Sequence, residues 1–167
     1  MRSILANSRR QTISLQEEVN TLDQYLRIEQ FCHRQKFDYS IELPPDLDAG
    51  ELNLPPMLLQ PFVENAVVHG VSHLPYPGHI AIRFSWQDDL LTCEICDNGI
   101  GRERAARLRE EKKPGHQSAA LQVTQERLEA LHRENSPPSL EITDLVDENG
   151  AIGGTRVVVR VPAEIVF

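Results

Sequence analysis

Apolar residues recur along the first part of the chain with the period of a helix. Between residues 15 and 26 the spacings are four, three and four, at Leu15, Val19, Leu22 and Leu26, which places these side chains on one face. Ser14 precedes this stripe and Glu17 follows Ser14 by three residues, the signature of a capping box. The pattern predicts an amphipathic helix whose stripe packs either on its own domain or on a partner helix.

Other segments alternate apolar and polar residues, which is typical of strands with one buried face. These predicted strands are residues 37–43, 79–86, 90–96, 140–146 and 155–162, and further helices are predicted at 57–69, 102–112 and 121–135. Residues 44–56 are expected to form a loop and residues 112–120 a flexible connection. This mixed order of hairpins and helices predicts an α+β fold, a two-layer α/β sandwich with a mixed sheet covered on one face by helices.

Composition limits the class of protein and of partner. The chain has 167 residues, enough for one domain with a full core, and is 40% hydrophobic and 25% charged. Its net charge of −8 argues against nucleic-acid binding, which depends on Lys and Arg contacts to phosphates. No apolar run approaches the roughly 20 residues that cross a bilayer.

The three cysteines, Cys32, Cys93 and Cys96, form no disulfide framework. Cys93 and Cys96 lie three apart in a predicted strand and so point to opposite faces, which favours small core residues over a redox or zinc pair. Free thiols are typical of a reducing cytoplasm.

The stretch CDNGIG, residues 96–101, joins a predicted strand to a predicted helix. Asp97 at the strand end can accept hydrogen bonds, and Gly99 and Gly101 allow unusual turns and close approach of a partner. The residues alone leave a plain turn and a ligand site open. A calcium loop lacks its further acids here, and a Rossmann turn lacks its third glycine.

The predicted helix at residues 57–69 reads MLLQPFVENAVVH. Asn65 and His69 are four residues apart, so they lie above one another on the same side. An amide and an imidazole beside a sheet can hold a metal–phosphate group, because an amide oxygen suits Mg²⁺. The alternative is that these polar residues simply face solvent.

Order and spacing of three motifs together point to a family. LQPFVENAVVHG, then CDNGIG about thirty residues further on, then GGTRVVVRVP, resemble the ATP-binding catalytic domain of sensor histidine kinases. Within this GHKL superfamily, whose domain has the Bergerat fold, the chain is most similar to the LytS/YehU type. The resemblance covers roughly residues 12–162.

The resemblance implies ATP and Mg²⁺ as ligands and assigns roles to the two main motifs. Asn65 matches the residue that coordinates Mg²⁺ on the ATP phosphates, and Asp97 the acid that accepts a hydrogen bond from the adenine amino group. Gly99 and Gly101 match the glycines beside the adenine and at the root of the ATP lid, residues 102–120.

Further site residues follow from the same resemblance. Gly154 and Thr155 match residues of the last strand pair. Leu121 matches the leucine of the family's lid motif, G-x-G-L-x-N. Glu64 and His69 match neighbours of Asn65 that position a base or contact phosphate, so that Glu64 and Asn65 are the expected catalytic residues.

The resemblance also implies an organisation and a set of partners. Residues 1–36 would be a helix and linker from a dimerisation region, and residues 37–167 the ATP-binding domain. The γ-phosphoryl would pass to a histidine on an upstream segment absent from this chain, in the same kinase or its dimer mate, and then to the receiver domain of a response regulator. The full-length kinase is expected to be a homodimer, anchored in a membrane, with this domain in the cytoplasm.

Two departures from the family pattern open an alternative. The lid motif G-x-G-L-x-N has Ser118, Ala120 and Val123 at its glycine and asparagine positions, and Val68 replaces a lysine. Candidate replacements for the missing charge are Lys112, Lys113, His116 and Arg127. The alternative is a degenerate nucleotide-binding or non-catalytic signalling and dimerisation module. An ATP-hydrolysing relative is disfavoured, because Pro61 stands where the general-base glutamate would be.

Overall fold

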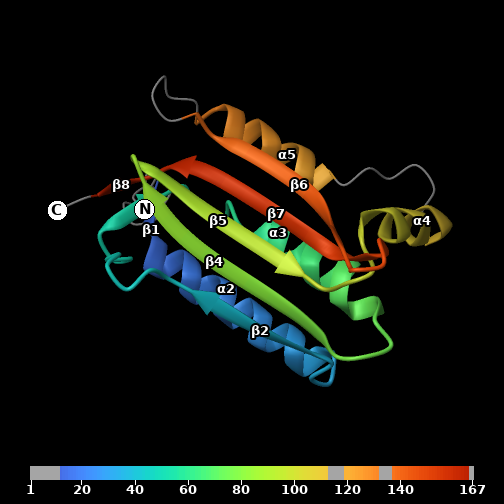
Figure 1. Cartoon of the computed structure of the whole chain (residues 1–167). Coiled ribbons are helices and arrows are strands. Elements are labelled where there is room, and N and C mark those ends of the chain that lie inside the picture. Colours follow the sequence, from blue (N-terminus) through green and yellow to red (C-terminus); the bar gives the residue numbers. More distant parts are fainter. Residues whose placement is uncertain (1–11, 113–118, 132–136, 166–167) are drawn as a thin grey trace, which may run out of the picture.

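A computed structural model describes residues 12–112, 119–131 and 137–165. Its main sheet has five strands in the order β2-β4-β5-β7-β6, with β2 parallel to β4 and the other neighbours antiparallel. These strands are β2 (Phe37–Glu42), β4 (Gly78–Gln87), β5 (Leu90–Asp97), β6 (Ser139–Val146) and β7 (Ile152–Pro162). In Figure 1 the helices α2 (Leu15–Cys32) and α3 (Gln60–Asn65) lie along one side of this sheet. The predicted α+β sandwich is confirmed.

The first helix begins as the sequence predicts. The Ser14 hydroxyl accepts a hydrogen bond from the Glu17 amide at 3.2 Å, and Glu17 accepts one from the Ser14 amide at 2.9 Å. The apolar stripe of α2 belongs to the same buried core as the sheet. Of the two alternatives for this stripe, packing on its own domain is therefore the one observed. The predicted domain division at residue 36 stays a prediction.

A small second sheet lies outside the prediction. Residues 44–56, expected to form a loop, contain β3 (Leu52–Leu54), which pairs with the two-residue strands β1 (Ile13–Ser14) and β8 (Glu164–Ile165). Both leucines of β3 are fully buried. Three residues are too short to display an alternating pattern, so periodicity could not find this strand.

The helix predicted at residues 57–69 begins later and changes its winding. Met57 has a positive φ of 57°, and α3 starts only at Gln60, with Pro61 in its first turn. After Asn65 the chain continues as a π-helical turn, η1 (Ala66–Gly70), and a 3₁₀ turn, η2 (Val71–His73). Such π-helical turns are often found at functional sites.

The remaining elements agree with the predicted periods. Asp88 and Asp89, with φ of 53° and 60°, form the tight turn between β4 and β5. The charged helix α4 (Arg102–Lys112) and the helix α5 (Ala119–Glu129) also form. Most of the predicted flexible connection, residues 113–118, lies outside the described residues. No helix in the described part of the chain has the length and apolarity needed to span a membrane.

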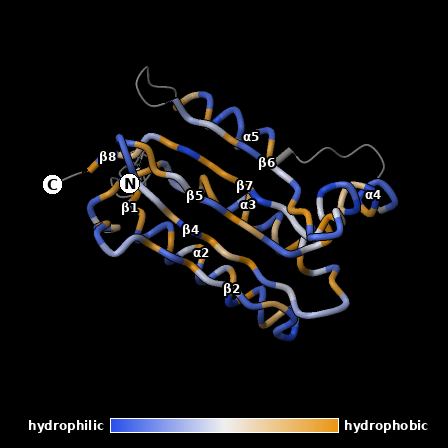
Figure 2. Tube along the Cα trace, in the orientation of Figure 1, coloured by the Kyte–Doolittle hydropathy of each residue, from blue (hydrophilic) through white to orange (hydrophobic). Residues whose placement is uncertain are grey.

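Alternation along β5 separates the two faces of the sheet. Leu91, Cys93 and Ile95 are buried under the helices, and Glu94 and Cys96 lie on the opposite, open face. Figure 2 shows this mixture of apolar and polar positions along the central strands. The two cysteines therefore point to opposite faces, as predicted, and burial raises the pKa of the Cys96 thiol to about 11, so it stays protonated at neutral pH.

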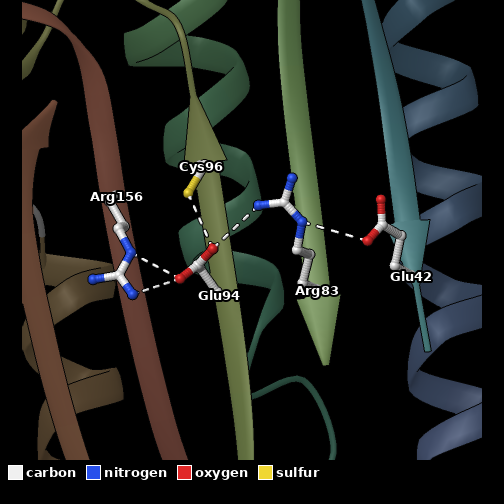
Figure 3. Close-up of polar contacts among 5 residues, drawn as sticks. All are labelled: Glu42, Arg83, Glu94, Cys96 and Arg156. Atoms are coloured by element: carbon white, nitrogen blue, oxygen red, sulfur yellow. Dashed lines mark hydrogen bonds and ion pairs between the residues drawn. The ribbon is translucent and has the colours of Figure 1, made fainter. Parts of the chain in front are cut away.

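On the open face, Glu94 is the centre of an ion-pair network that crosses four strands (Figure 3). Its carboxylate lies 3.3 Å from Arg83 Nη1 on β4 and 2.8 Å from Arg156 Nε on β7. Arg83 Nε also lies 3.4 Å from Glu42 on β2. Cross-strand pairs of opposite charge stabilise a sheet by about 0.2–1 kcal/mol each. On the open face, these four charged side chains are therefore paired with one another.

We expect Glu94→Gln to lower the free energy of unfolding by about 0.5–1 kcal/mol at pH 7. Burial alone would raise the pKa of Glu94, but hydrogen bonds from Arg156 and Arg83 lower it below its usual 4.5. The contribution is therefore fully present above pH 4.5 and is lost at lower pH, as the pH falls through the lowered pKa of the folded chain. Urea denaturation at pH 7 and pH 3 measures the difference. Glu141→Gln, which removes one exposed 3.4 Å pair with Arg160, is the control and should change less. Equal losses at both pH values would contradict the expectation.

Candidate functional site

A cavity of about 260 Å³ lies between the α3–η1 helix and the sheet, with α4 along one side. Its apolar wall includes Phe62, Ala66, Ile95, Ile142 and Val157. Six of the nine predicted site residues line it, namely Asn65, His69, Asp97, Gly101, Leu121 and Thr155. An apolar pocket with a few convergent polar groups is the usual form of a small-molecule site.

Asp97 supplies a buried carboxylate to this cavity. It is the last residue of β5 and is in phase with the buried Ile95, so the alternation of the strand turns it under the helices with 6% exposure. Burial raises its pKa to about 6, although amide hydrogen bonds from Gly99 and Thr155 oppose this. The Gly99 amide donates to Oδ1 at 2.9 Å. At neutral pH the group is an ionised acceptor.

Two glycines allow other backbone segments to approach Asp97 closely, although these glycines do not line the cavity. A Cβ on Gly99 would lie 2.4 Å from the backbone of Gly70, the last residue of η1. Gly154 has φ of 139°, and a Cβ there would lie 1.9 Å from the carbonyl oxygen of Asp97. Only glycine permits both approaches. The ends of η1, β5 and β7 therefore meet at Asp97.

The polar residues of the α3–η1 helix do not all reach the cavity. Asn65 and His69 line it. Burial is the main cause that lowers the pKa of His69, and the nearby charges of Arg109 and His73 lower it further, so its imidazole is neutral at pH 7. Glu64 does not line the cavity, and its carboxylate accepts a hydrogen bond from Gln60 Nε2 at 3.1 Å.

Arg109 is a cavity residue that the sequence reasoning missed. It lines the cavity from α4, and its Nε is buried without a hydrogen-bond partner among the described residues. Arg102, which also lines the cavity, is instead paired with Asp144 at 2.9 Å. The signal for Arg109 was its spacing of four from Ala105, which puts both residues on the side of α4 that faces the cavity.

Of the four predicted replacements for the missing lysine, the structure describes the side chain of Arg127 but not that of Lys112. Arg127 does not line the cavity; its guanidinium donates hydrogen bonds to the carbonyl oxygens of Pro56 and Met57. Lys113 and His116 lie outside the described residues. Val68 itself is 45% exposed and lies outside the cavity lining. Within the described part of the chain, Arg109 is the better candidate for that charge.

Comparisons with known proteins give sequence relatives that are sensor kinases. The chain is 31% identical over 150 residues to the sensor protein LytS of Oceanobacillus iheyensis, and 35% identical over 86 residues to the sensor histidine kinase BtsS of Escherichia coli. These matches cover 86% and 52% of this chain but only 25% and 15% of those proteins. No protein-family profile matches the chain.

Solved structures similar in fold are histidine kinases. The mycobacterial sensor histidine kinase MprB matches with a TM-score of 0.59 at 13% identity, covering 93% of this chain and 98% of that one. The histidine kinase ThkA, solved in complex with the response regulator protein TrrA, matches with a TM-score of 0.58 at 15% identity, covering 96% of this chain and 45% of that one. At such identities the likeness concerns the fold.

We expect Asp97→Asn to stabilise the unliganded chain at pH 7.5 by about 1–2 kcal/mol. The carboxyl has a folded pKa of about 6 against an ordinary 3.8, so between these values the folded chain binds more protons than the unfolded chain. Stability therefore falls as the pH rises through that window, and a neutral amide removes the loss. Chemical denaturation at pH 7.5 and pH 4 tests this, since the gain should shrink toward pH 4. A gain independent of pH would refute the assigned cause.

Proposed function

Because this chain is related to the LytS- and BtsS-type sensor histidine kinases and has the fold of histidine kinase catalytic domains, we propose that it is the ATP-binding catalytic domain of a two-component sensor histidine kinase. The observation that carries this proposal is the buried Asp97 carboxylate in a cavity that also contains Asn65 and His69. The domain would supply the γ-phosphoryl of ATP to a histidine on another segment of the kinase.

The proposed adenine position follows from the cavity wall. Phe62, Ile95 and Val157 offer apolar surface to a flat base, and Asp97 offers an acceptor to its amino group. A base without that amino group would leave the remaining acceptor capacity of the buried Asp97 carboxylate unused, which penalises its binding. Asp97 would therefore select adenine, with Gly101, Leu121 and Thr155 around it.

The proposed phosphate position lies along Asn65, His69 and Arg109. Among the described residues there is no group of three or more His, Cys, Asp or Glu side chains that could hold a metal. Mg²⁺ would therefore be held by phosphate oxygens, water and the Asn65 amide oxygen, as suits a cation that keeps several waters. It would neutralise phosphate charge during transfer, a reaction that depends mainly on positioning and electrostatics. Arg109 would add the charge that Val68 lacks.

The remaining assignments are proposals of the same kind. Glu64 would act as the base-positioning residue, for which its carboxylate would have to leave Gln60 and turn toward the substrate. Gly99 and Gly154 would act by allowing close packing at Asp97. Residues 102–120 would form the lid, with Arg109 on it.

Partners follow from the proposed reaction. The phosphoacceptor helix of the same kinase or of its dimer mate would present the histidine, and a response regulator would receive the phosphoryl group. The complex of ThkA with its response regulator supports a partner of this class. The full-length protein would be a homodimeric, membrane-anchored kinase with this domain in the cytoplasm.

We expect Mg²⁺-ATP to stabilise the chain, by about 2.7 kcal/mol at a hundred times its Kd. Asp97→Asn should abolish this gain while leaving the chain folded, since it removes the acceptor for adenine. Asp46→Asn, an exposed residue outside the cavity lining, is the matched control and should keep the gain. Thermal unfolding with and without nucleotide gives the answer. If millimolar ATP moves no midpoint, the non-catalytic signalling module replaces the kinase proposal.

We expect Arg109→Met to weaken ATP binding by about 10- to 100-fold and to leave adenosine binding unchanged. The reason is that a charge-assisted hydrogen bond to phosphate contributes about 1.5–3 kcal/mol, and adenosine has no phosphate. Isothermal titration calorimetry with both ligands measures the two affinities. Arg104→Met, an exposed arginine on the same helix outside the cavity lining, is the control. Equal weakening of both ligands would contradict a phosphate contact.

A further inference from the structure

The turn that precedes α3, residues 56–59, is held by charged side chains from two other helices. From α2, the Glu18 carboxylate accepts hydrogen bonds from the amides of Met57 at 3.2 Å and Leu59 at 3.3 Å. From α5, Arg127 donates to the carbonyl oxygens of Met57 at 3.2 Å and Pro56 at 2.6 Å. We call this pair of side chains the turn clamp.

Burying the carboxylate of Glu18 costs free energy, and the hydrogen bonds that it accepts offset this cost. It is 1% exposed on the otherwise apolar buried face of α2. A buried carboxylate needs hydrogen-bond donors, and the first turn of a helix has unpaired amides. Leu59, the N-cap residue of α3, has no side-chain cap of its own. Glu18 instead accepts from the amide of Leu59 itself, 41 residues away in sequence, and so satisfies the backbone donor at which α3 begins.

Met57 is held in a backbone conformation that it does not prefer. Its φ is 57°, in the left-handed region that is rare for residues other than glycine. Its side chain is 48% exposed, so packing of that side chain does not account for the conformation. Strained residues persist where the surroundings over-determine them, and they cluster at functional sites. Here both the amide and the carbonyl of Met57 are taken by the turn clamp.

The clamped turn leads directly into the candidate site. The helix that starts after it carries Asn65 and His69 into the cavity, and α5, which carries Arg127, also carries Leu121 to the cavity wall. Three elements from separate parts of the chain are thus fixed at one point. This turn is therefore in contact both with the helix that carries the polar groups of the cavity and with the helix that carries Leu121.

We propose that Glu18 and Arg127 are positioning residues of the nucleotide site. By holding the 56–59 turn, they set the α3–η1 helix and α5 in the arrangement that binds nucleotide, and they connect α2 to that arrangement. This inference rests on the proposed ATP-binding function, and it adds a means by which α2 influences affinity.

The first test compares affinity with stability. In Glu18→Gln an amide nitrogen replaces one acceptor oxygen, and Arg127→Met removes both donors. We expect each single variant to raise the Kd for Mg²⁺-ATP about tenfold in calorimetry. Because both side chains act on one turn, the Kd of the double variant should be at most about twice that of the weaker-binding single variant. The matched control is the open-face pair, changed as Glu141→Gln and Arg160→Met, which should leave Kd unchanged.

A rescue separates positioning from a merely structural role. Glycine adopts φ near 57° without strain, so Met57→Gly should hold the turn without the full clamp. Added to Glu18→Gln, it should return the Kd to within about threefold of the unmodified chain. The proposal is overturned if the single variants have a lowered thermal midpoint but an unchanged Kd. It is also overturned if the variant with Met57→Gly added to Glu18→Gln does not recover its affinity.

A second readout needs no nucleotide and so distinguishes failure of this inference from failure of the kinase proposal. In hydrogen exchange followed by mass spectrometry, Glu18→Gln should lose protection together at residues 60–70 and 119–129, with β4 and β5 unchanged. If the unmodified chain binds no ATP, the kinase proposal fails, and this measurement still decides the connection. Loss at residues 60–70 alone would show that the clamp does not join α5 to the helix.

Discussion

A carboxylate buried at the end of β5 is the constraint around which the rest of the site is arranged. The alternation that buries Ile95 also turns Asp97 under the helices. Because a buried carboxylate requires donors, the chain brings the amides of Gly99 and Thr155 to it. Those approaches in turn require glycine at 99 and 154, where any side chain would meet backbone atoms. The acceptor capacity that remains is what the cavity offers to a ligand.

On its other face, β5 carries a carboxylate whose acceptor capacity is taken up by neighbouring arginines. Glu94 lies three residues before Asp97 and points to the open face, where guanidinium groups of Arg83 and Arg156 surround it. Its pKa is lowered, whereas that of Asp97 is raised to about 6. A fully paired carboxylate stabilises the sheet and has little capacity left for a ligand. An underpaired carboxylate costs stability and keeps that capacity, as functional groups often do.

The sequence predicts those elements that depend on residues close to one another along the chain. Periodicity and the capping box place α2 and the β4–β5 hairpin, and family motifs point to Asn65 and Asp97. The late start of α3, the strand β3 and the turn clamp have no such signal. They depend on contacts between residues that are far apart in the sequence: about 40 positions from Glu18 to Leu59, 70 from Arg127 to Met57, and more than 100 from β3 to β8. Arg109 was recoverable in principle from helical spacing, but only once Ala105 was known to face the cavity.

The burial of α2 limits how this helix can influence the cavity. Leu15, Leu22 and Leu26 are fully buried, and each buried leucine contributes about 1.5–3 kcal/mol. Detaching the helix would therefore cost roughly 5–9 kcal/mol, whereas nucleotide at a hundred to a thousand times its Kd supplies only about 2.7–4.1 kcal/mol. At these concentrations nucleotide binding supplies too little free energy to drive the undocking of α2. Coupling has to occur through small shifts of a docked helix, and the Glu18 hydrogen bonds to the turn before α3 are a contact short and directional enough to transmit them.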